Sequence, residues 1–375
     1  MTKKMTYAGV GVNYDAMDPF KRDAQAVAAT TDHFVERFGF KVVPWSRGES
    51  VFLIETPWGY LGFVVEGLGT KNMVADDLYR LGKQVESLFG KSFYDQVAQC
   101  NVAMVVNDTI TLGTLPVSLG QYLAVGDSGW FSDERRRADL IEGTRKACVL
   151  ARCVWGGGET PTLKGIIMPG TSDLSGAAMG WLAKKDRVLG PHKIQHDDAI
   201  ILIESSGIHA NGLTMARKIA DKLPDGYLTR LDDGRTYGET LLDPTHIYVA
   251  LVEDCLNRGV SIHYAVNITG HGWRKLMRAT QSFAYIIEYL PKQLPIFDFL
   301  QKHGPVDDKE AYGNFNMGAG FALYVSEADV ATVLEVAASH KLGALRAGYI
   351  EQSNEKKVVI RPKGLEYSGS TLRLR

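Results

Sequence analysis

Three short strings in the first half of the chain each place an acid beside glycines, a lysine or an amide. Such groups can bind phosphate and a divalent cation. The first is Glu66-Gly67-Leu68-Gly69-Thr70-Lys71. Its glycines let backbone amides approach an anion, Thr70 adds a hydroxyl donor, and Lys71 adds a positive charge. It is not a Walker A loop, which needs about four residues between its first glycine and its Gly-Lys pair. The string predicts a phosphate cradle, and a tight turn is the alternative.

Two further acids follow apolar runs. Val105-Val106-Asn107-Asp108 has the pattern of a strand end, where Asp108 could ligate Mg²⁺ in a phosphoryl-transfer site, and a helix N-cap is the alternative. Trp155-Gly156-Gly157-Gly158-Glu159-Thr160 either brings bare backbone close to a ligand with Glu159 pointing at it or forms a flexible turn. Since Glu66, Asp108 and Glu159 each end an expected strand, we expect their carboxylates to share divalent ions between phosphates.

Three strings in the second half carry hydroxyl, imidazole and amide groups. Residues 204–212 contain Ser206, His209 and Asn211 between an expected strand and helix, which suits recognition of polar groups or phosphate, or a capped loop. Residues 267–272 open a helix, and residues 315–321 lead into a strand. These last two strings are typical of loops in which the backbone approaches a ligand.

The elements that must position these strings follow from the spacing of apolar residues. Short apolar runs predict strands at 51–54, 60–65, 102–106, 117–123 and 199–203. Apolar residues three and four apart predict helices at 24–38, 75–89, 133–152, 213–222, 244–258, 272–280, 296–304 and 327–341. Strands and helices alternate twice along the chain, which indicates an α/β or α+β protein with two units.

The boundary between the two units is expected near residue 170, because Gly, Pro, Ser and Thr concentrate between residues 165 and 180. The predicted domains are therefore 1–170 and 171–375. The length of 375 residues is sufficient for two domains, each with its own core.

Composition excludes several classes of protein. There are 42 Lys+Arg and 43 Asp+Glu, a net charge of −1, which argues against a nucleic-acid backbone or an anionic membrane as the main partner. The one dense basic cluster, Arg135-Arg136-Arg137, lies among acids and predicts a solvated helix face.

The four cysteines have no zinc-site spacing and are interpreted as the reduced thiols of a cytosolic protein. No apolar segment follows the two lysines near the N-terminus, so no secretory signal is expected. The longest uncharged stretch, 109–126, is interrupted by Gly113, Pro116 and Gly120 and does not predict a membrane span.

Taken in order, the strings resemble those of the phosphoribosylformylglycinamidine cyclo-ligase family, also called aminoimidazole ribonucleotide synthetases. The family patterns are D-G-V-G-T-K, V-N-D, G-G-E-T, S-S-G-x-H-S-N-G, P-T-R-I-Y, I-T-G-G-G and F-N-M-G-x-G. The corresponding residues here are 66–71, 106–108, 157–160, 205–212, 244–248, 268–272 and 315–320. Together these motifs are far more specific than any one of them, and they span about residues 6 to 360.

The resemblance implies a two-domain fold. Its N-terminal α/β domain, 1–170, would bind ATP and pair its sheet with that of a second subunit, and its C-terminal α/β domain, 171–375, would close over the cleft. The implied reaction belongs to de novo purine synthesis. ATP activates the formyl oxygen of formylglycinamidine ribonucleotide, the imidazole ring closes, and ADP and phosphate leave. The implied protein is a cytoplasmic homodimer that uses ATP and Mg²⁺ and binds neither nucleic acid nor membrane.

The resemblance also implies roles for individual residues. The catalytic residues would be Lys71, Asp108 and His209. ATP and its phosphates would be bound by Gly67, Gly69, Thr70, Lys71, Asn107, Gly157, Gly158 and Thr160. Substrate would be bound by Ser206, His209, Asn211, Thr269 and Gly270. The metal ligands would be Glu66, Asp108 and Glu159.

This chain departs from the family patterns at several positions, which indicates a divergent member. Glu66 replaces an aspartate, His271 replaces a glycine, and Asn267 and His246 stand where histidine and arginine are common. The third motif continues into a longer loop, 161–170, that lacks the usual second acid.

These departures leave two alternatives open: another ATP-dependent phosphoryl-activating enzyme of the superfamily, and a catalytically silent nucleotide-binding regulator. Selenophosphate synthetase and the hydrogenase-maturation member both use a cysteine that this chain lacks, and thiamine monophosphate kinase lacks the fourth and last strings in this form.

Overall fold

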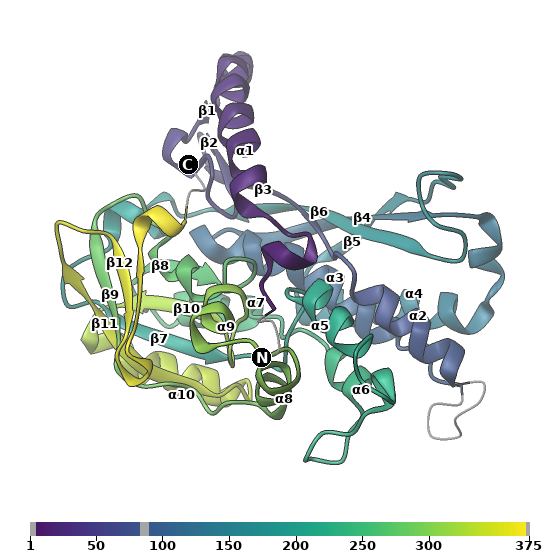
Figure 1. Ribbon diagram of the computed structural model, residues 1–375. Coiled ribbons are helices and arrows are strands. Elements are labelled where there is room, and N and C mark those ends of the chain that lie inside the picture. The colour runs from purple at the N-terminus through teal and green to yellow at the C-terminus, as the bar shows by residue number, and fades with distance from the viewer. Residues whose placement is uncertain (1–4, 83–89, 373–375) are drawn as a thin grey trace.

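The computed structural model describes residues 5–82 and 90–372, which form two sheets side by side, each with its own helices (Figure 1). The first sheet has six strands in the order β1-β2-β3-β6-β4-β5, and only the pair β4–β5 is parallel. Its strands are β1 (Lys41–Val42), β2 (Phe52–Thr56), β3 (Gly59–Gly67), β4 (Leu115–Val125), β5 (Val154–Glu159) and β6 (Ser172–Leu182).

Helices cover one face of the first sheet. Helix α3 (Tyr94–Thr109) packs on β3 and β6, α4 (Glu134–Leu150) packs on α3, and α2 (Lys71–Leu81) starts directly after the loop that follows β3. On the other face, apolar side chains of alternate strand residues are exposed, among them Val65 at 62% and Met179 at 46%. This open face is a large apolar patch of the kind that marks an interaction surface.

The N-terminal arm consists of α1 (Tyr14–Ala28) and the 3-10 helix Ala29–Phe38. It projects beyond the body of the molecule near β1 and β2 (Figure 1). The predicted helix at 24–38 therefore corresponds to the second half of α1 and the 3-10 helix that follows it.

The second sheet has seven strands in the order β13-β12-β9-β11-β7-β10-β8. They are β7 (Ala199–Glu204), β8 (Ile262–Asn267), β9 (Phe283–Ile287), β10 (Ala319–Val325), β11 (Ala344–Gln352), β12 (Lys357–Ile360) and β13 (Leu365–Ser368). The helices of this half are α5 (Leu213–Ala220), α6 (Tyr237–Leu241), α7 (Val249–Asn257), α8 (Pro295–His303), α9 (Asp308–Asn314) and α10 (Val330–Ser339). Two α/β units with separate sheets agree with the predicted fold class.

The predicted strand at 102–106 is wrong, because these residues form the middle of α3. Val102, Val105 and Val106 are fully buried, since α3 is covered by the sheet on one side and by α4 on another. A helix buried on several sides has no polar face, so its apolar run cannot be distinguished from a buried strand by periodicity. Asp108 consequently lies in the last turn of a helix rather than at a strand end or an N-cap.

Three predicted helices are shifted. Helix α2 begins at Lys71, four residues before the predicted start, and residues 83–89 of that prediction lie outside the described part of the chain. The segment 244–248 is not helical, so α7 begins at Val249. The predicted helix at 272–280 is a 3-10 helix over Gly272–Met277.

The predicted boundary near residue 170 requires correction. β6 pairs with β3 and β4 along its whole length, so the first sheet continues to Leu182. The chain enters the second sheet only at Ala199. The Gly- and Pro-rich segment before residue 172 is a loop inside the first domain, because it connects two strands of the same sheet.

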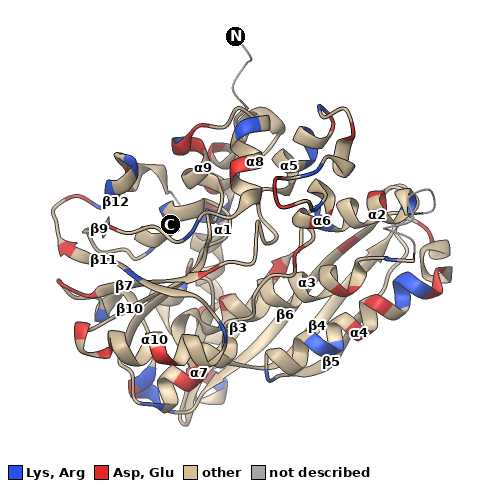
Figure 2. Ribbon diagram, turned by 90° about the horizontal axis from the view of Figure 1, so that it is seen from below, with Lys and Arg blue, Asp and Glu red and all other residues tan. Residues whose placement is uncertain are grey.

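Charged residues of both signs are distributed along the helices and loops (Figure 2). Within the basic cluster, Arg135 and Arg137 are exposed as predicted, but Arg136 points inward. Its guanidinium lies 3.1 Å from Asp76 and 4.6 Å from the Trp130 ring centroid. In residues 5–82 and 90–372, no helix has both the length and the apolar character needed to cross a membrane.

Candidate active site

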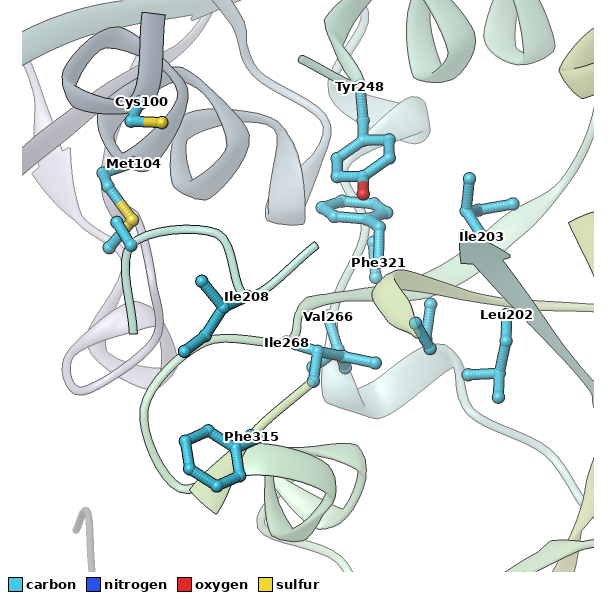
Figure 3. Close-up of a cluster of buried hydrophobic side chains, with 14 of the residues drawn as sticks. Cys100, Met104, Leu202, Ile203, Ile208, Tyr248, Val266, Ile268, Phe315 and Phe321 are labelled. Carbon is cyan, nitrogen blue, oxygen red and sulfur yellow. The ribbon is translucent and has the colours of Figure 1, made fainter. Parts of the chain in front are cut away.

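The predicted site residues of motifs one, two, four and six gather where the two domains meet. The loop before α2 and the end of α3 face loops 205–212, 243–248 and 268–272 of the second domain. Met104 of α3 lies against the loop that carries Ile208, above an apolar layer that includes Phe315 and Phe321 (Figure 3). The Tyr248 ring packs at a tilt on Phe321, with 5.1 Å between ring centroids.

Lys71 joins the two domains at this place. It is the first residue of α2 and is fully buried. Its ammonium donates to the backbone carbonyls of His209 at 2.9 Å and Asp243 at 2.6 Å. An ammonium has three donors, so two of them have partners among the described residues.

The phosphate cradle predicted around Lys71 has the geometry of an anion site. No atom lies within 4 Å of the position that a Cβ would take at Gly67 or Gly69, so the backbone there is accessible. The Thr70 hydroxyl oxygen is buried and has no hydrogen-bond partner among the described residues. Both features precede the N-terminus of an eleven-residue helix, which attracts anions through its free N–H groups and its dipole.

Asp108 lies in a polar cluster that crosses between the domains. Its Oδ1 accepts a hydrogen bond from the Asn267 amide at 2.7 Å. Glu66 hydrogen-bonds to the same carboxyl, and burial together with the Asp108 charge raises the pKa of Glu66 to about 8. Since two like charges at short range disfavour joint ionisation, this carboxyl pair is poised to hold a proton or a cation.

Lys275 completes this cluster and was missed by the sequence prediction. Its ammonium donates to the Thr269 hydroxyl, and the carboxylates of Asp108 and Glu66 lie close enough to act on it electrostatically. Burial lowers the pKa of Lys275 to about 8. The sequence signal that could have identified Lys275 is a lysine inside the apolar pattern of 272–277. This pattern carries no catalytic signature.

Asn107, predicted to bind phosphate, instead holds the two domains together. Its amide nitrogen donates to the His246 carbonyl at 2.8 Å, and its amide oxygen accepts from the Tyr248 backbone N–H at 2.9 Å. Each end of the amide bonds once to the segment that precedes α7, so one N–H and one oxygen lone pair of Asn107 have no partner among these contacts.

His209 organises the loop at 205–212. Its ring is buried, and Nε2 accepts from the Ser206 backbone N–H at 3.2 Å, so the ring proton resides on Nδ1. Burial, together with nearby His246 and Lys71, holds the pKa of His209 well below its usual range. His209 is therefore a neutral group at physiological pH.

The other predicted substrate-binding side chains of this loop also have internal partners. The Ser206 hydroxyl donates to the Pro244 carbonyl at 2.6 Å, and the Asn211 amide contacts the Met104 sulfur at 3.8 Å. Asn316 of the last motif secures the same loop, because its amide donates to the Gly207 carbonyl and its oxygen accepts from the Ser205 hydroxyl.

The N-terminal arm covers the loop at 269–272. The Tyr14 ring stacks on His271 with 3.6 Å between centroids, and its hydroxyl accepts from the His271 backbone N–H at 3.2 Å. A Cβ at Gly270 would lie 3.0 Å from the Tyr14 hydroxyl, so a larger residue there would crowd this approach. The histidine that replaces the family's glycine thus has a packing partner in this chain.

The third motif lies elsewhere. Glu66 of β3 pairs with Gly176 of β6. Gly176 in turn pairs with Gln121 of β4, and Gln121 pairs with Gly158 of β5. Gly158 is therefore three strand spacings from Glu66, roughly 14 Å. Glu159, one residue further along, faces the opposite side of the sheet. The three predicted metal ligands consequently do not meet within one chain.

Two hollows adjoin the third motif. A cavity of about 400 Å³ is lined mainly by apolar and aromatic groups, including Trp130, Phe131 and Trp155, and also by Gly157, Gly158, Glu159 and Thr160. A groove of about 500 Å³ crosses the open face of the sheet from Val65 to Glu159. The predicted phosphate cradle at Gly67–Lys71 thus follows the inner strand β3, whereas the third motif lies on the edge strand β5 of the same sheet.

The last glycine of the seventh motif, Gly320, predicts a measurable effect. A Cβ at Gly320 would lie 2.1 Å from the Tyr248 hydroxyl and 2.5 Å from Cε1 of His209. Both side chains are buried, so we expect Gly320→Ala to lower the free energy of unfolding by about 1–3 kcal/mol in urea titrations. Gly120→Ala in β4 is the control, since its nearest neighbour would be 3.9 Å away. A loss of equal size in both variants would contradict this interpretation.

The chain is similar in sequence to known proteins over most of its length. The pattern of the AIR synthase related protein, N-terminal domain, matches residues 65–182, and that of the AIR synthase related protein, C-terminal domain, matches residues 195–361. The phosphoribosylformylglycinamidine cyclo-ligase of Methanococcus maripaludis is 32% identical over 352 residues, covering 94% of this chain and 93% of that protein. The protein of the same name from Carboxydothermus hydrogenoformans is 32% identical, covering 96% and 99%.

Among solved structures, AaThiL complexed with AMPPCP and TMP has the same fold. It matches with a TM-score of 0.56 at 13% identity, covering 96% of this chain and 99% of that one.

Proposed function

The chain belongs to the phosphoribosylformylglycinamidine cyclo-ligase family, and from this premise we propose that it closes the imidazole ring of 5-aminoimidazole ribonucleotide in purine biosynthesis. The substrates are formylglycinamidine ribonucleotide and ATP, and the products include ADP and phosphate. The observation that carries this proposal is the phosphate cradle at Gly67–Lys71 directly beside the Glu66–Asp108 pair, with loops of the second domain facing both.

The reaction needs positioning and charge neutralisation more than a protein nucleophile. The γ-phosphoryl group of ATP activates the formyl oxygen, an amidine nitrogen attacks that carbon, and phosphate leaves as the ring closes. The N–H groups at the start of α2 and the Thr70 hydroxyl bind the phosphates. The third donor of Lys71 supplies positive charge beside them. Neutral His209 stabilises the loop at 205–212 by accepting a hydrogen bond from the Ser206 backbone N–H.

We assign Mg²⁺ to Glu66 and Asp108. Mg²⁺ is commonly held by one or two carboxylates together with substrate phosphates and water, and these two carboxyl groups in contact beside the cradle fit that requirement. When bound, the ion neutralises phosphate charge. Within residues 5–82 and 90–372 no group of three acidic, histidine or cysteine side chains forms a closed metal site. Glu159 is left out of this ligand pair because β6 and β4 lie between it and Glu66.

The decisive experiment measures ADP release with formylglycinamidine ribonucleotide, ATP and Mg²⁺, and follows the aminoimidazole product by diazo coupling. We expect ADP and aminoimidazole in equal amounts, and neither without the ribonucleotide. ATP binding with no ADP release would favour the regulatory alternative. ADP release only with a different acyl or amide ribonucleotide would retain phosphoryl activation but replace the substrate.

We also propose a homodimer formed through the open face of the first sheet. A dimer would cover the exposed apolar side chains of β3 and β6 and place Glu159 and the groove beside the second copy. We further propose a cytoplasmic location, which the four free thiols support.

The dimer predicts that Val65→Asp produces a monomer in sedimentation experiments, because Val65 is 62% exposed at the centre of this face and a buried charge is costly. Val149→Asp is a matched control, since this valine is 65% exposed on the far side of α4. A monomeric wild-type protein, or dissociation in both variants, would remove the proposed interface.

A further inference from the structure

Helix α4 ends in a turn that brings two cysteines together. Arg152 has a left-handed backbone with φ of 52°. The Cys153 N–H donates to the Cys148 carbonyl at 3.1 Å, and the Arg152 N–H donates to the Val149 carbonyl at 3.1 Å. These two bonds and the left-handed residue define a Schellman cap, in which the side chains at the ends of the longer hydrogen bond contact each other. Here both of those side chains are thiols.

The two thiols influence each other's ionisation. Their interaction lowers the pKa of Cys148 and, together with burial, raises the pKa of Cys153. Cys148 is buried and Cys153 is half-buried, so Cys153 is the member of the pair that a reagent can reach. The other two cysteines, Cys100 and Cys255, are fully buried in different parts of the fold.

We propose that Cys148 and Cys153 form a reversible dithiol–disulfide site that reacts with low-molecular-weight disulfides of the glutathione class. Cys153, the more accessible of the two thiols, first exchanges with glutathione disulfide, so that one S–S bond breaks, a mixed disulfide forms, and one glutathione thiol leaves. The Cys148 thiolate then attacks the Cys153 sulfur, which forms the intrachain bond and releases the second glutathione thiol. Two protein thiols are oxidised while one glutathione disulfide is reduced.

The position of this site gives the modification a structural consequence. Arg152 lies between the cysteines, and its guanidinium contacts Glu253 at 2.6 Å and Asp254 at 2.9 Å on α7 of the second domain. Asp254 also contacts His340 of α10 at 2.8 Å. On the other side, Cys153 directly precedes β5, which carries the third motif. A disulfide would fix the turn that holds this contact between the domains.

The test treats the full-length protein with glutathione disulfide and counts thiols under denaturing conditions, followed by peptide mapping. We expect the count to fall from the four free cysteines to two, with Cys148 and Cys153 in one linked peptide. Dithiothreitol should restore all four. Cys148→Ser should accumulate glutathione on Cys153, whereas Cys100→Ser and Cys255→Ser should form the disulfide as the wild type does. A stable mixed disulfide on wild-type Cys153, or four unchanged thiols, would overturn the proposal.

A second measurement uses the wild-type protein, so it does not depend on whether a variant folds. Phenylarsine oxide binds a pair of adjacent thiols much more tightly than a single thiol. We expect one arsenical per chain on the reduced protein and none after glutathione disulfide treatment, with the bound arsenical mapped to the peptide that contains Cys148 and Cys153. Absence of arsenical on the reduced protein would overturn the proposal, because the thiols would then not be adjacent.

Discussion

Asp108→Asn is expected to lower kcat for ADP release by about 100-fold or more while the protein remains folded. Asparagine has the same shape, so the oxygen that accepts from the Asn267 amide at 2.7 Å is retained. The substitution removes the negative charge that faces Glu66 and is assigned to Mg²⁺. Loss of one group that acts on developing charge in a transition state commonly costs this much.

The measurement is steady-state ADP release together with urea unfolding. Asp76→Asn is the matched control, because Asp76 is another buried carboxylate, held by Tyr94 at 2.9 Å and Arg136 at 3.1 Å outside the site. We expect the opposite outcome for it, a loss of stability with kcat retained. Unchanged kcat in Asp108→Asn would exclude Asp108 from the reaction.

Lys71→Met is expected to affect stability and activity together. Methionine has a similar length but no donors, so the His209 and Asp243 carbonyls would be left buried and unpaired. Each unpaired buried acceptor costs about 1–3 kcal/mol, so we expect the free energy of unfolding to fall by roughly 3 kcal/mol. ADP release should fall below detection, because the charge beside the phosphate cradle and the placement of loop 205–212 are lost together.

Urea titrations and ATP binding by the folded fraction of the variant check this prediction. Lys218→Met is the control, because Lys218 is exposed and its ion pair with Asp221 at 3.3 Å lies on the surface. Normal ATP affinity in folded Lys71→Met would show that the lysine acts on the domain contact alone. Wild-type stability would contradict the hydrogen bonds described here.

How well the sequence predicted the surroundings of a single residue depended on how local the structural signal was. Gly69 was predicted to let the backbone approach a ligand, and the structure gives it a positive φ of 75° and open space. Asn107 was assigned to phosphate from its motif, yet its amide is used on both sides by the His246–Tyr248 backbone. That contact joins residues about 140 positions apart, which no local pattern can indicate.

The three predicted metal ligands illustrate the same limit. Each carboxylate was singled out from its own string, but sharing one ion depends on strand order and register. β6 and β4 lie between β3 and β5, so Glu159 is separated from Glu66 across the sheet. Asp108 reaches Glu66 because it lies on a helix that packs on β3, where a strand had been expected.

The sequence by itself determined the family, the two-unit α/β class and the loops that form the candidate site. These depend on glycines and small polar residues whose backbone requirements are local, and on the order of motifs along the chain. Only the tertiary structure decided that Lys275 joins Asp108, that Lys71 bridges the domains, and that the first sheet continues to Leu182. Burial, strand register and packing between distant segments determine those outcomes, because they are properties of the whole fold.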